Sequence, residues 1–313
     1  EGLYSKALDR IVEVENGLLK PMLKGEDISR YANLQNRYFV IFPYIIENAK
    51  AKPMGEAYIQ EHFPNGYKYL KANEAFLRGR EKGKMDKDGW FLYIYPKSLT
   101  EFEQQKIITP EISLGSNMSF DEGIFYHNTK VYSFIKKSAV KEDYKFFLAL
   151  LNSSLMWFFL KNTGYELRGG YFVFKTKFLE PFPLPKLEHI DQQEPFTEKA
   201  NIMLSLNKQL QEAKQNFLNE LNLEKIPKKL QNFEELEFEE FVKEYTKAKK
   251  IKFTDKLEER TFKHQWQSLF EHDKTLTCNL KSEIDKTDKE IDAMVYALYG
   301  LSEDDIRIVE GVL

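Results

Sequence analysis

The stretch Phe182-Pro183-Leu184-Pro185 separates two kinds of sequence in this chain. Its two prolines have no backbone N–H to donate, and each holds the residue before it in an extended conformation, so no helix can continue through it. A chain of 313 residues with 42% hydrophobic side chains is long enough to bury more than one core. We therefore predict one domain over residues 1–185 and a second over residues 186–313.

Before this boundary the chain is rich in Tyr, Phe and β-branched residues and is punctuated by Gly and Pro, which is typical of strands joined by turns. The strand candidates are Arg37–Ile46, Trp90–Tyr95, Lys106–Ile112, Gly123–Ile135 and Tyr171–Phe174. Helices are expected at Gly55–Phe63, Lys68–Lys82 and Tyr144–Leu160. The first domain is therefore predicted to be a mixed α/β domain.

After Pro195 the pattern changes to long helices, so the fold class predicted for the whole chain is α+β. Apolar residues recur at steps of three and four in two stripes, as on one face of a helix. The first stripe is Met203, Leu206, Leu210, Ala213, Phe217 and Leu221, and Pro227 follows it. The second is Phe262, Trp266, Leu269, Leu276, Leu280, Ile284, Ile291, Val295 and Leu298, interrupted by Asp273 and Thr287. An intramolecular helical bundle is favoured over an intermolecular coiled coil, because neither stripe sustains clean heptads.

The chain end carries helix-boundary signals. Gly300 fits the position just after a helix, and Ser302 with Asp305 three residues later forms a capping-box pattern that predicts a last short helix.

The composition excludes several classes of protein. A single cysteine, Cys278, cannot form an internal disulfide or a multi-cysteine metal site, which suits a reducing cytoplasm. The longest apolar run, Phe146–Leu160, is shorter than the roughly 20 residues of a membrane span. No secretory signal is visible, so we expect a soluble cytoplasmic protein.

The net charge of −3 conceals an asymmetry. Residues 1–185 contain 26 Lys and Arg against 22 Asp and Glu, whereas the remainder contains 20 against 27. Such a split suits a first half that faces a polyanion and a second half that packs against protein or solvent, although an ordinary domain often has a similar imbalance. The acidic run around Glu234 and Glu235 is interpreted as a solvated helix face.

No catalytic or metal-binding constellation stands out. The sequence lacks a phosphate loop of the G-x-x-x-x-G-K-[ST] type, a G-x-G-x-x-G after a strand and an H-E-x-x-H motif. His264 and His272 lie eight residues apart on a predicted helix without a third ligand, so a solvated or capping role is favoured over a metal site. We expect no catalytic residues, no metal and no cofactor on this chain.

Basic residues interleaved with aromatic and amide side chains point instead to DNA. The first candidate set is Arg78, Arg80, Lys82, Lys84 and Trp90, in a Gly-containing segment that can cross a phosphate backbone. The competing interpretation is a mobile charged loop in which Glu81, Asp86 and Asp88 cancel much of the field.

Two further sets are candidates for contacting DNA. One is Tyr165, Arg168, Gly169, Gly170 and Tyr171, where glycines permit close backbone approach, followed by Lys175 and Lys177 at alternate positions, as on one side of a strand. The other is Asn117, Ser119 and Asn128, whose polar groups can read base edges. Asparagine in turns more often serves the backbone, so that alternative stays open.

Several motifs, in order, resemble the TaqI-like C-terminal specificity domain found in adenine-N6 DNA methyltransferases and in restriction enzymes. They are Leu19–Tyr31 (LKPMLKGEDISRY), Ile107–Ser113, Phe120–Gly123, Leu150–Ser153, Arg168–Tyr171, Leu179–Pro185 and Glu290–Leu301. The resemblance implies recognition of double-stranded DNA. It also implies that the helical half spaces or packs against catalytic domains of a larger enzyme.

In that family the methyltransferase domain carries an Asn-Pro-Pro-Tyr motif, which this chain lacks. The resemblance therefore implies target recognition without catalysis, in a parent enzyme that uses S-adenosylmethionine and, if it cleaves DNA, Mg²⁺. The parent is expected to be a site-specific adenine methyltransferase, a type II restriction endonuclease or both. The alternative is a protein-interaction scaffold that uses its helical half.

Overall fold

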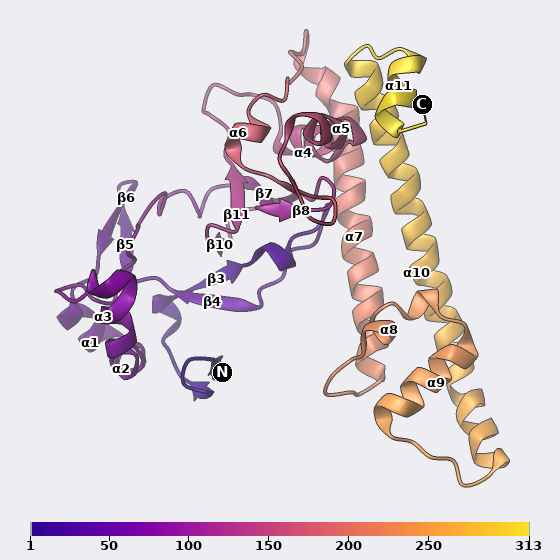
Figure 1. Cartoon of the computed structure of the whole chain (residues 1–313), viewed down its shortest axis with the longest axis horizontal. Coiled ribbons are helices and arrows are strands. Elements are labelled where there is room, and N and C mark those ends of the chain that lie inside the picture. The colour runs from indigo at the N-terminus through magenta and orange to yellow at the C-terminus, as the bar shows by residue number, and fades with distance from the viewer. Residues whose placement is uncertain (1, 313) are drawn as a thin grey trace. The chain divides into compact units, whose positions relative to one another are not determined.

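The computed structural model describes residues 2–312. The chain divides into two units, each described separately below. The strand unit comprises residues up to 28, 34–112 and 120–139, and the helical unit comprises residues 29–33, 113–119 and 140 onward. The boundary between these two units does not fall at Pro185. The helices that precede Pro185 pack on the long helices that follow Pro185 and belong to the same unit. The α+β fold class is confirmed (Figure 1).

The strand unit is built from small sheets. Its hairpins are β1 (Leu3–Ser5) with β2 (Arg10–Val12) and β5 (Tyr44–Glu47) with β6 (Lys50–Pro53). One three-stranded sheet has the order β10 (Tyr126–His127), β3 (Leu19–Leu23) and β4 (Tyr38–Ile41). Another has the order β11 (Val131–Phe134), β7 (Lys106–Pro110) and β9 (Ser119–Asp121), and its central strand is buried along its whole length.

Two of the expected strands are interrupted. Arg37–Ile46 forms β4 and β5 with Phe42 and Pro43 between them, since proline cannot donate to a sheet ladder. Gly123–Ile135 forms β10 and β11, joined by the turn at Asn128–Lys130.

Three short helices complete the strand unit: α1 (Glu56–His62), α2 (Pro64–Ala72) and α3 (Glu74–Gly83). They enclose a core of Leu18, Met54, Ile59, Leu70, Trp90 and Phe91. The strand predicted at Trp90–Tyr95 is wrong, because this segment forms turns. Trp90 and Phe91 are both buried although they are consecutive, whereas a half-buried strand exposes every second residue.

The helical unit begins with α4 (Tyr144–Asn152) and α5 (Ser154–Thr163), where the sequence predicted one helix. Ser153 separates them. Its backbone is extended, with ψ 157°, and its hydroxyl accepts a hydrogen bond of 3.2 Å from Met156 N, so it caps the second helix. The next elements are a sheet of order β12 (Glu166–Leu167), β13 (Tyr171–Val173) and β8 (Ile112–Ser113), and the short α6 (Thr176–Leu179).

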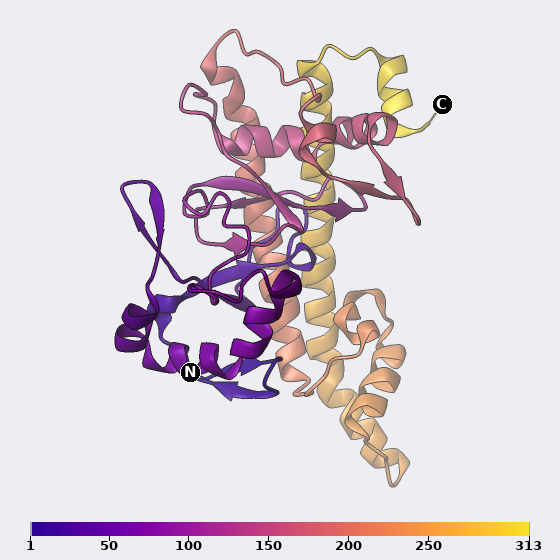
Figure 2. The same ribbon diagram turned by 60° about the vertical axis from the view of Figure 1, so that its left-hand side comes forward.

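Two long helices, α7 (Glu194–Glu220) and α10 (Lys256–Leu298), pack side by side, which confirms the predicted helix pairing within the chain (Figures 1 and 2). The buried residues of α7 include Met203, Ala213 and Phe217 from the predicted stripe. Thr287 interrupts the stripe of α10 but is buried with its hydroxyl donating to Glu283 O at 2.8 Å, so its polar group is satisfied.

Between the long helices, α8 (Lys228–Gln231) and α9 (Phe238–Lys249) pack on one end of the pair. The core there is rich in aromatic rings: Phe217, Phe233, Phe241, Tyr245 and Phe270 are all buried. The solvated helix face predicted around Glu234 is wrong for that residue. Its carboxylate is buried and lies 2.8 Å from Lys214 Nζ of α7 and 2.5 Å from Lys281 Nζ of α10.

The predicted end of the chain is confirmed. Gly300 has a φ of +65° just after α10, and Ser302 and Asp305 form the capping box of α11 (Glu303–Glu310). Among the helices of residues 2–312, none combines the length and the apolar character needed to cross a membrane.

Candidate nucleic-acid interface

The basic segment that begins in the last part of α3 makes contacts within the strand unit. Arg78 Nε donates to Glu74 Oε1 at 2.9 Å, Arg78 Nη1 lies 3.3 Å from Asp86 Oδ1, and the guanidinium stacks 5.4 Å from the centre of the Trp90 ring. Arg78 therefore has two carboxylate partners and an aromatic partner of its own, which leaves it less available to a phosphate.

The Arg80 side chain donates hydrogen bonds to backbone carbonyls of the segment Trp90–Leu92. Its Nε donates to Leu77 O at 2.8 Å, and its Nη2 donates to Trp90 O at 2.7 Å and to Leu92 O at 2.9 Å. Burial lowers the pKa of Arg80 from its ordinary value. These bonds satisfy carbonyl groups that no strand partner satisfies, which explains why Trp90–Tyr95 is ordered without being a strand.

The prediction that Trp90 and Arg80 contact DNA needs correction. The indole of Trp90 is fully buried, and its Nε1 donates to Glu56 Oε2 at 3.3 Å. Both side chains make their hydrogen bonds inside the strand unit, so neither is a candidate for contacting DNA.

Lys82 and Lys84 are the members of this set that point into solvent. Glu81 and Lys82 both have a positive φ, of 50° and 58°, so the backbone departs from helical geometry and kinks near the end of α3. Lys84 Nζ lies 4.5 Å from the centre of the Tyr95 ring, which is itself 60% exposed. These two lysines remain available to a polyanion.

Asn117 and Ser119 hold together two segments of the helical unit. Ser119 is fully buried; its hydroxyl donates to Ser29 O at 2.6 Å and accepts from Ala32 N at 2.9 Å. The amide of Asn117 accepts from Arg30 N at 3.2 Å and donates to Ser113 Oγ at 2.7 Å. We correct the prediction for both residues, because their polar groups are used to dock residues 29–33 against residues 113–119.

Asn128 belongs to the strand unit and serves a turn. Its side-chain oxygen accepts from Lys130 N at 2.9 Å between β10 and β11. This is the backbone role that the sequence left open for turn asparagines. The residue is exposed, so its amide NH₂ group faces solvent.

The hairpin of β12 and β13 presents its turn to solvent. Arg168, Gly169 and Gly170 connect the two strands, and the glycines have φ of +86° and +78°, a region that side chains disfavour. Arg168 is exposed at this turn, and the flanking Tyr165 and Tyr171 are 58% and 44% exposed.

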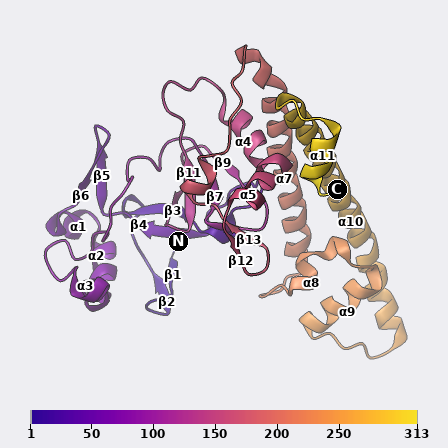
Figure 3. The same ribbon diagram turned by 45° about the horizontal axis from the view of Figure 1, so that its top comes forward.

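The other face of the hairpin is anchored. Phe172 is buried, and its ring packs edge-on against Trp157 of α5 with centroids 5.2 Å apart, so the hairpin lies beside α5 (Figure 3). Cross-strand pairs of a hairpin share one face, and Glu166 pairs with Phe172, while Leu167 pairs with Tyr171 on the opposite face. The exposed arginine and tyrosines are thus carried by a fixed support.

Leu114 is a member of this surface that the sequence did not indicate. It is 57% exposed, and a Cβ atom on Gly170 would lie 3.7 Å from its Cδ1. The one available signal was an apolar residue within the polar run Ser113–Ser116, and its proximity to the hairpin comes only from the pairing of β8 with β13.

Lys175 and Lys177 are exposed, but the strand on which they were placed ends at Val173. Lys175 is the N-cap of α6, and Lys177 lies within that helix with its Nζ 4.5 Å from the centre of the Phe178 ring. The prediction that they share one side of a strand is therefore wrong, although both follow the hairpin closely in the chain.

The buried charges of the strand unit do not form a reaction centre. Lys106 Nζ lies 2.5 Å from Asp121 Oδ2, and both side chains are buried. The carboxylate also accepts from the backbone N–H groups of Gly123, Ile124 and Phe125, at 3.2, 2.9 and 3.1 Å. A substrate has no access to this pair, so its role is to fix the turn after β9.

An ion pair in the helical unit joins residues 29–33 to α10. Arg30 Nη1 lies 2.5 Å from Asp288 Oδ2, and burial raises the pKa of Asp288 to about 6. One turn further along, Asp292 accepts from Ser154 N at 2.8 Å and from Ser154 Oγ at 2.6 Å at the start of α5. These contacts hold three segments of the helical unit in register.

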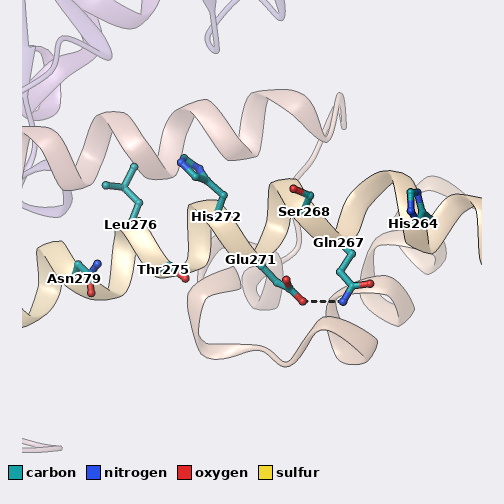
Figure 4. A pocket seen from close by; sticks show the side chains of 8 residues that line it. All are labelled: His264, Gln267, Ser268, Glu271, His272, Thr275, Leu276 and Asn279. Carbon is teal, nitrogen blue, oxygen red and sulfur yellow. Dashed lines mark hydrogen bonds between the residues drawn. The ribbon is translucent and has the colours of Figure 1, made fainter.

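Metal binding finds no support in the described residues. Within residues 2–312, no three His, Cys, Asp or Glu side chains are placed to share a metal ion. Figure 4 shows a shallow hollow along α10 in which His264 and His272 lie well apart. Eight residues of helix separate them by about 12 Å, too far for two ligands of one ion.

A model of the TaqI-like C-terminal specificity domain matches residues 20–184, and a model described as a domain of unknown function (DUF8810) matches residues 189–295. No protein with a curated description matches the chain. The first match covers more than half of the chain and includes β3, β7 and the exposed hairpin. The chain belongs to the TaqI-like C-terminal specificity domain family, a family of restriction-modification target-recognition domains.

Proposed function

We propose that this chain reads a short sequence in duplex DNA and positions that duplex for catalytic domains of a larger restriction-modification enzyme. The observation that carries the proposal is the hairpin turn Arg168-Gly169-Gly170, exposed between two exposed tyrosines and anchored on its other face. A rigid ribbon of this kind is narrow enough for the major groove of DNA.

The chemistry of the turn suits base recognition. An arginine can donate two parallel hydrogen bonds to O6 and N7 of guanine, which is the commonest specific contact in the major groove. Tyr165 and Tyr171 offer a hydroxyl for hydrogen bonds and a ring for stacking. The adjacent glycines have no side chain to keep the backbone away from the duplex.

The exposed lysines supply the other part of a DNA interface. Lys82 and Lys84 in the strand unit, and Lys175 and Lys177 in the helical unit, are all exposed to solvent. Contacts from lysine to phosphate oxygens fix the register of a protein on the duplex but carry no sequence information. We assign the lysines to affinity and the hairpin to specificity.

Methyl transfer to adenine N6 and strand cleavage are assigned to other domains of the parent enzyme, which would bind S-adenosylmethionine and Mg²⁺. The residues of this chain do not fit the nucleoside cofactor: its one Gly-Gly turn joins two antiparallel strands, whereas a cofactor-binding glycine loop leads from a strand into a helix.

The test is selection of bound sequences from a randomised duplex pool by the whole chain, followed by a salt titration on the selected site. We expect one short sequence to be enriched and its affinity to fall as salt rises. The Arg168→Ala variant should retain binding to random duplex but lose most of the enrichment. If the wild-type chain binds duplex with no sequence preference, or does not bind it in complex with its catalytic domains, the recognition proposal fails and the scaffold alternative takes its place.

A further inference from the structure

Lysines gather at the free end of the helical pair, where α9 ends and α10 begins. Lys247 and Lys250 lie three residues apart at the end of α9, Lys252 lies in the loop and Lys256 is the first residue of α10; we call these four residues the lysine tip. All four are exposed. Figures 1 and 2 both show this loop at the end of α10 opposite to α11.

The carboxylates near the lysine tip are engaged elsewhere. Lys229 Nζ lies 2.8 Å from Glu240 and 3.3 Å from Glu244. Glu259 is paired with Lys263 at 2.9 Å, and Glu258 accepts from Thr254 N at 2.7 Å. Asp255 accepts from two backbone N–H groups as the cap of α10. In the part of the chain that the structure describes, no carboxylate lies within 4.0 Å of the Nζ atom of any of the four lysines, so their positive charges add up.

Helix stability accounts for Lys247 but not for Lys250 or Lys256. A lysine in the last turn of a helix is stabilised by the helix dipole, which explains Lys247. Lys256 lies at the opposite end, in the first turn of α10, where the dipole disfavours positive charge. Lys250 has a φ of +59° after α9, with Ile251 N donating to Thr246 O at 2.9 Å, a helix ending at which Gly is the usual residue. Two of the four lysines are therefore locally unfavourable.

The basic residues of the strand unit behave differently. Arg78 is paired with Glu74, Lys20 with Glu103, Lys130 with Glu111, and Lys106 with Asp121. These four basic residues are thus neutralised by carboxylates of the same unit. The acidic second half, in contrast, carries an unneutralised cluster at one end.

We propose that the lysine tip binds the phosphate backbone of duplex DNA without reading its sequence. This rests on the proposed function, since the recognition domain is what brings a duplex to the chain. Asp292 of α10 binds the start of α5, the helix on which the hairpin packs. At 1.5 Å per residue, the lysine tip lies about 54 Å along α10 from Asp292. It can therefore bind DNA only outside the few base pairs that the hairpin would read, and it would add affinity and hold the flanking duplex.

A membrane surface is the competing polyanion, and the apolar residues at this end disfavour it. Helices that bind lipid surfaces expose a broad apolar face beside their lysines. Here Phe253 packs on Phe262 with ring centroids 5.3 Å apart, and both are partly buried. Leu257 is 72% exposed, but one leucine does not make a broad apolar face.

The test compares two variants of the whole chain that lose the same charge. One is Lys250→Gln with Lys252→Gln and Lys256→Gln; the control is Lys208→Gln with Lys286→Gln and Lys289→Gln, three exposed lysines in the middle of α7 and in α10. Each is titrated against a random-sequence duplex of about 40 base pairs over a salt series. The tip variant should bind about 10-fold more weakly at low salt, with the slope of log affinity against log salt reduced by two to three, and the control should behave as wild type.

A single substitution separates binding from folding. Lys250→Gly places the preferred residue at the left-handed position, so its Tm should rise by about 2 °C while its salt slope falls by about one. A loss of affinity together with a gain in stability cannot come from misfolding.

Three results overturn the inference: a tip variant that matches wild type on DNA, an equal loss in the control variant, or a loss confined to vesicles of phosphatidylserine and phosphatidylcholine. Sequence enrichment from the randomised pool is measured on the same variants. If enrichment persists while the tip variant binds as wild type, only this inference fails. If no sequence is enriched but the tip variant loses affinity, the recognition proposal fails and the lysine tip stands.

Discussion

Lys106 Nζ and Asp121 Oδ2 lie 2.5 Å apart in the interior of the strand unit, and neither side chain is more than 1% exposed. The lysine also donates to Phe102 O at 2.5 Å, so the ammonium group bridges a carboxylate and a backbone carbonyl. Removing one partner of such a pair leaves the other charge buried and uncompensated, which is the costly case for an ion pair.

Lys106→Met should therefore lower the free energy of unfolding by about 3–5 kcal/mol, measured by urea denaturation of the whole chain. Adding Asp121→Asn to this variant should recover part of the loss, because it removes the unpaired charge. Lys52→Met, which breaks the exposed pair with Glu47, is the control and should have little effect. Equal effects of the two lysine substitutions would contradict the interpretation.

Arg80 is predicted to act on stability, in contrast to its exposed neighbour. Arg80→Ala leaves the carbonyls of Leu77, Trp90 and Leu92 without their donor and should cost about 2–3 kcal/mol in thermal or urea unfolding. Lys82→Ala, two residues away, should leave stability unchanged and weaken DNA binding at low salt. A loss of DNA affinity in Arg80→Ala without any loss of stability would return Arg80 to the interface.

Arg168 is predicted to separate sequence recognition from general DNA binding. Arg168→Ala should reduce the preference for the selected sequence over random duplex by about 10- to 100-fold, equivalent to 1–3 kcal/mol for a bidentate contact to guanine. Arg168→Lys should not restore it, because an ammonium group cannot make the two parallel hydrogen bonds. If the lysine variant restores the full preference, Arg168 contacts phosphate and base reading lies elsewhere.

Asp288 should make stability depend on pH. Its carboxyl pKa is raised from 3.8 to about 6 by burial, so between these values the folded state holds a proton that the unfolded state releases. The free energy of unfolding therefore falls as pH rises from about 4 to about 6, by up to about 3 kcal/mol, and this contribution is constant outside that range.

Asp288→Asn removes the titrating group while leaving an oxygen that can accept from Arg30. The difference in unfolding free energy between wild type and this variant should change between pH 4 and pH 6 and stay level from pH 6.5 to pH 8. A difference that stays constant from pH 4 to pH 6 would show that Asp288 titrates at its ordinary pKa.

The helical half was largely predictable from sequence, since its signals are local. The stripe through Met203 and Phe217 reports a helix with one buried face, and the capping box of Ser302 with Asp305 lies within one turn. The break at Ser153 was missed because the apolar run on both sides of it satisfies either one helix or two. The residue that decides between them is a cap, and its effect depends on its extended backbone.

The candidate site was predictable only where exposure follows from local structure. The glycines at 169 and 170 indicate a turn, and an arginine beside such a turn is exposed; that the turn joins two paired strands came from the structure. The same reasoning failed for Trp90 and Ser119, whose partners lie 34 and 90 residues away in the chain, at Glu56 and Ser29. Basic composition likewise could not tell a paired Arg78 from an unpaired Lys250, since pairing depends on which carboxylates the fold brings near.

By itself, the sequence determined the long helices, the α+β class, the glycine turn at Gly169-Gly170 and the family, because each is written in spacings of a few residues or in an ordered series of motifs. Tertiary structure decided which polar and charged groups remain free. Arg80 donates to the carbonyls of Trp90 and Leu92, and Asn117 accepts from Arg30 N, 87 residues away in the chain. The free energy of burying a polar group depends on finding such partners. For that reason the division of this chain into scaffold residues and candidate interface residues emerged only from the folded chain.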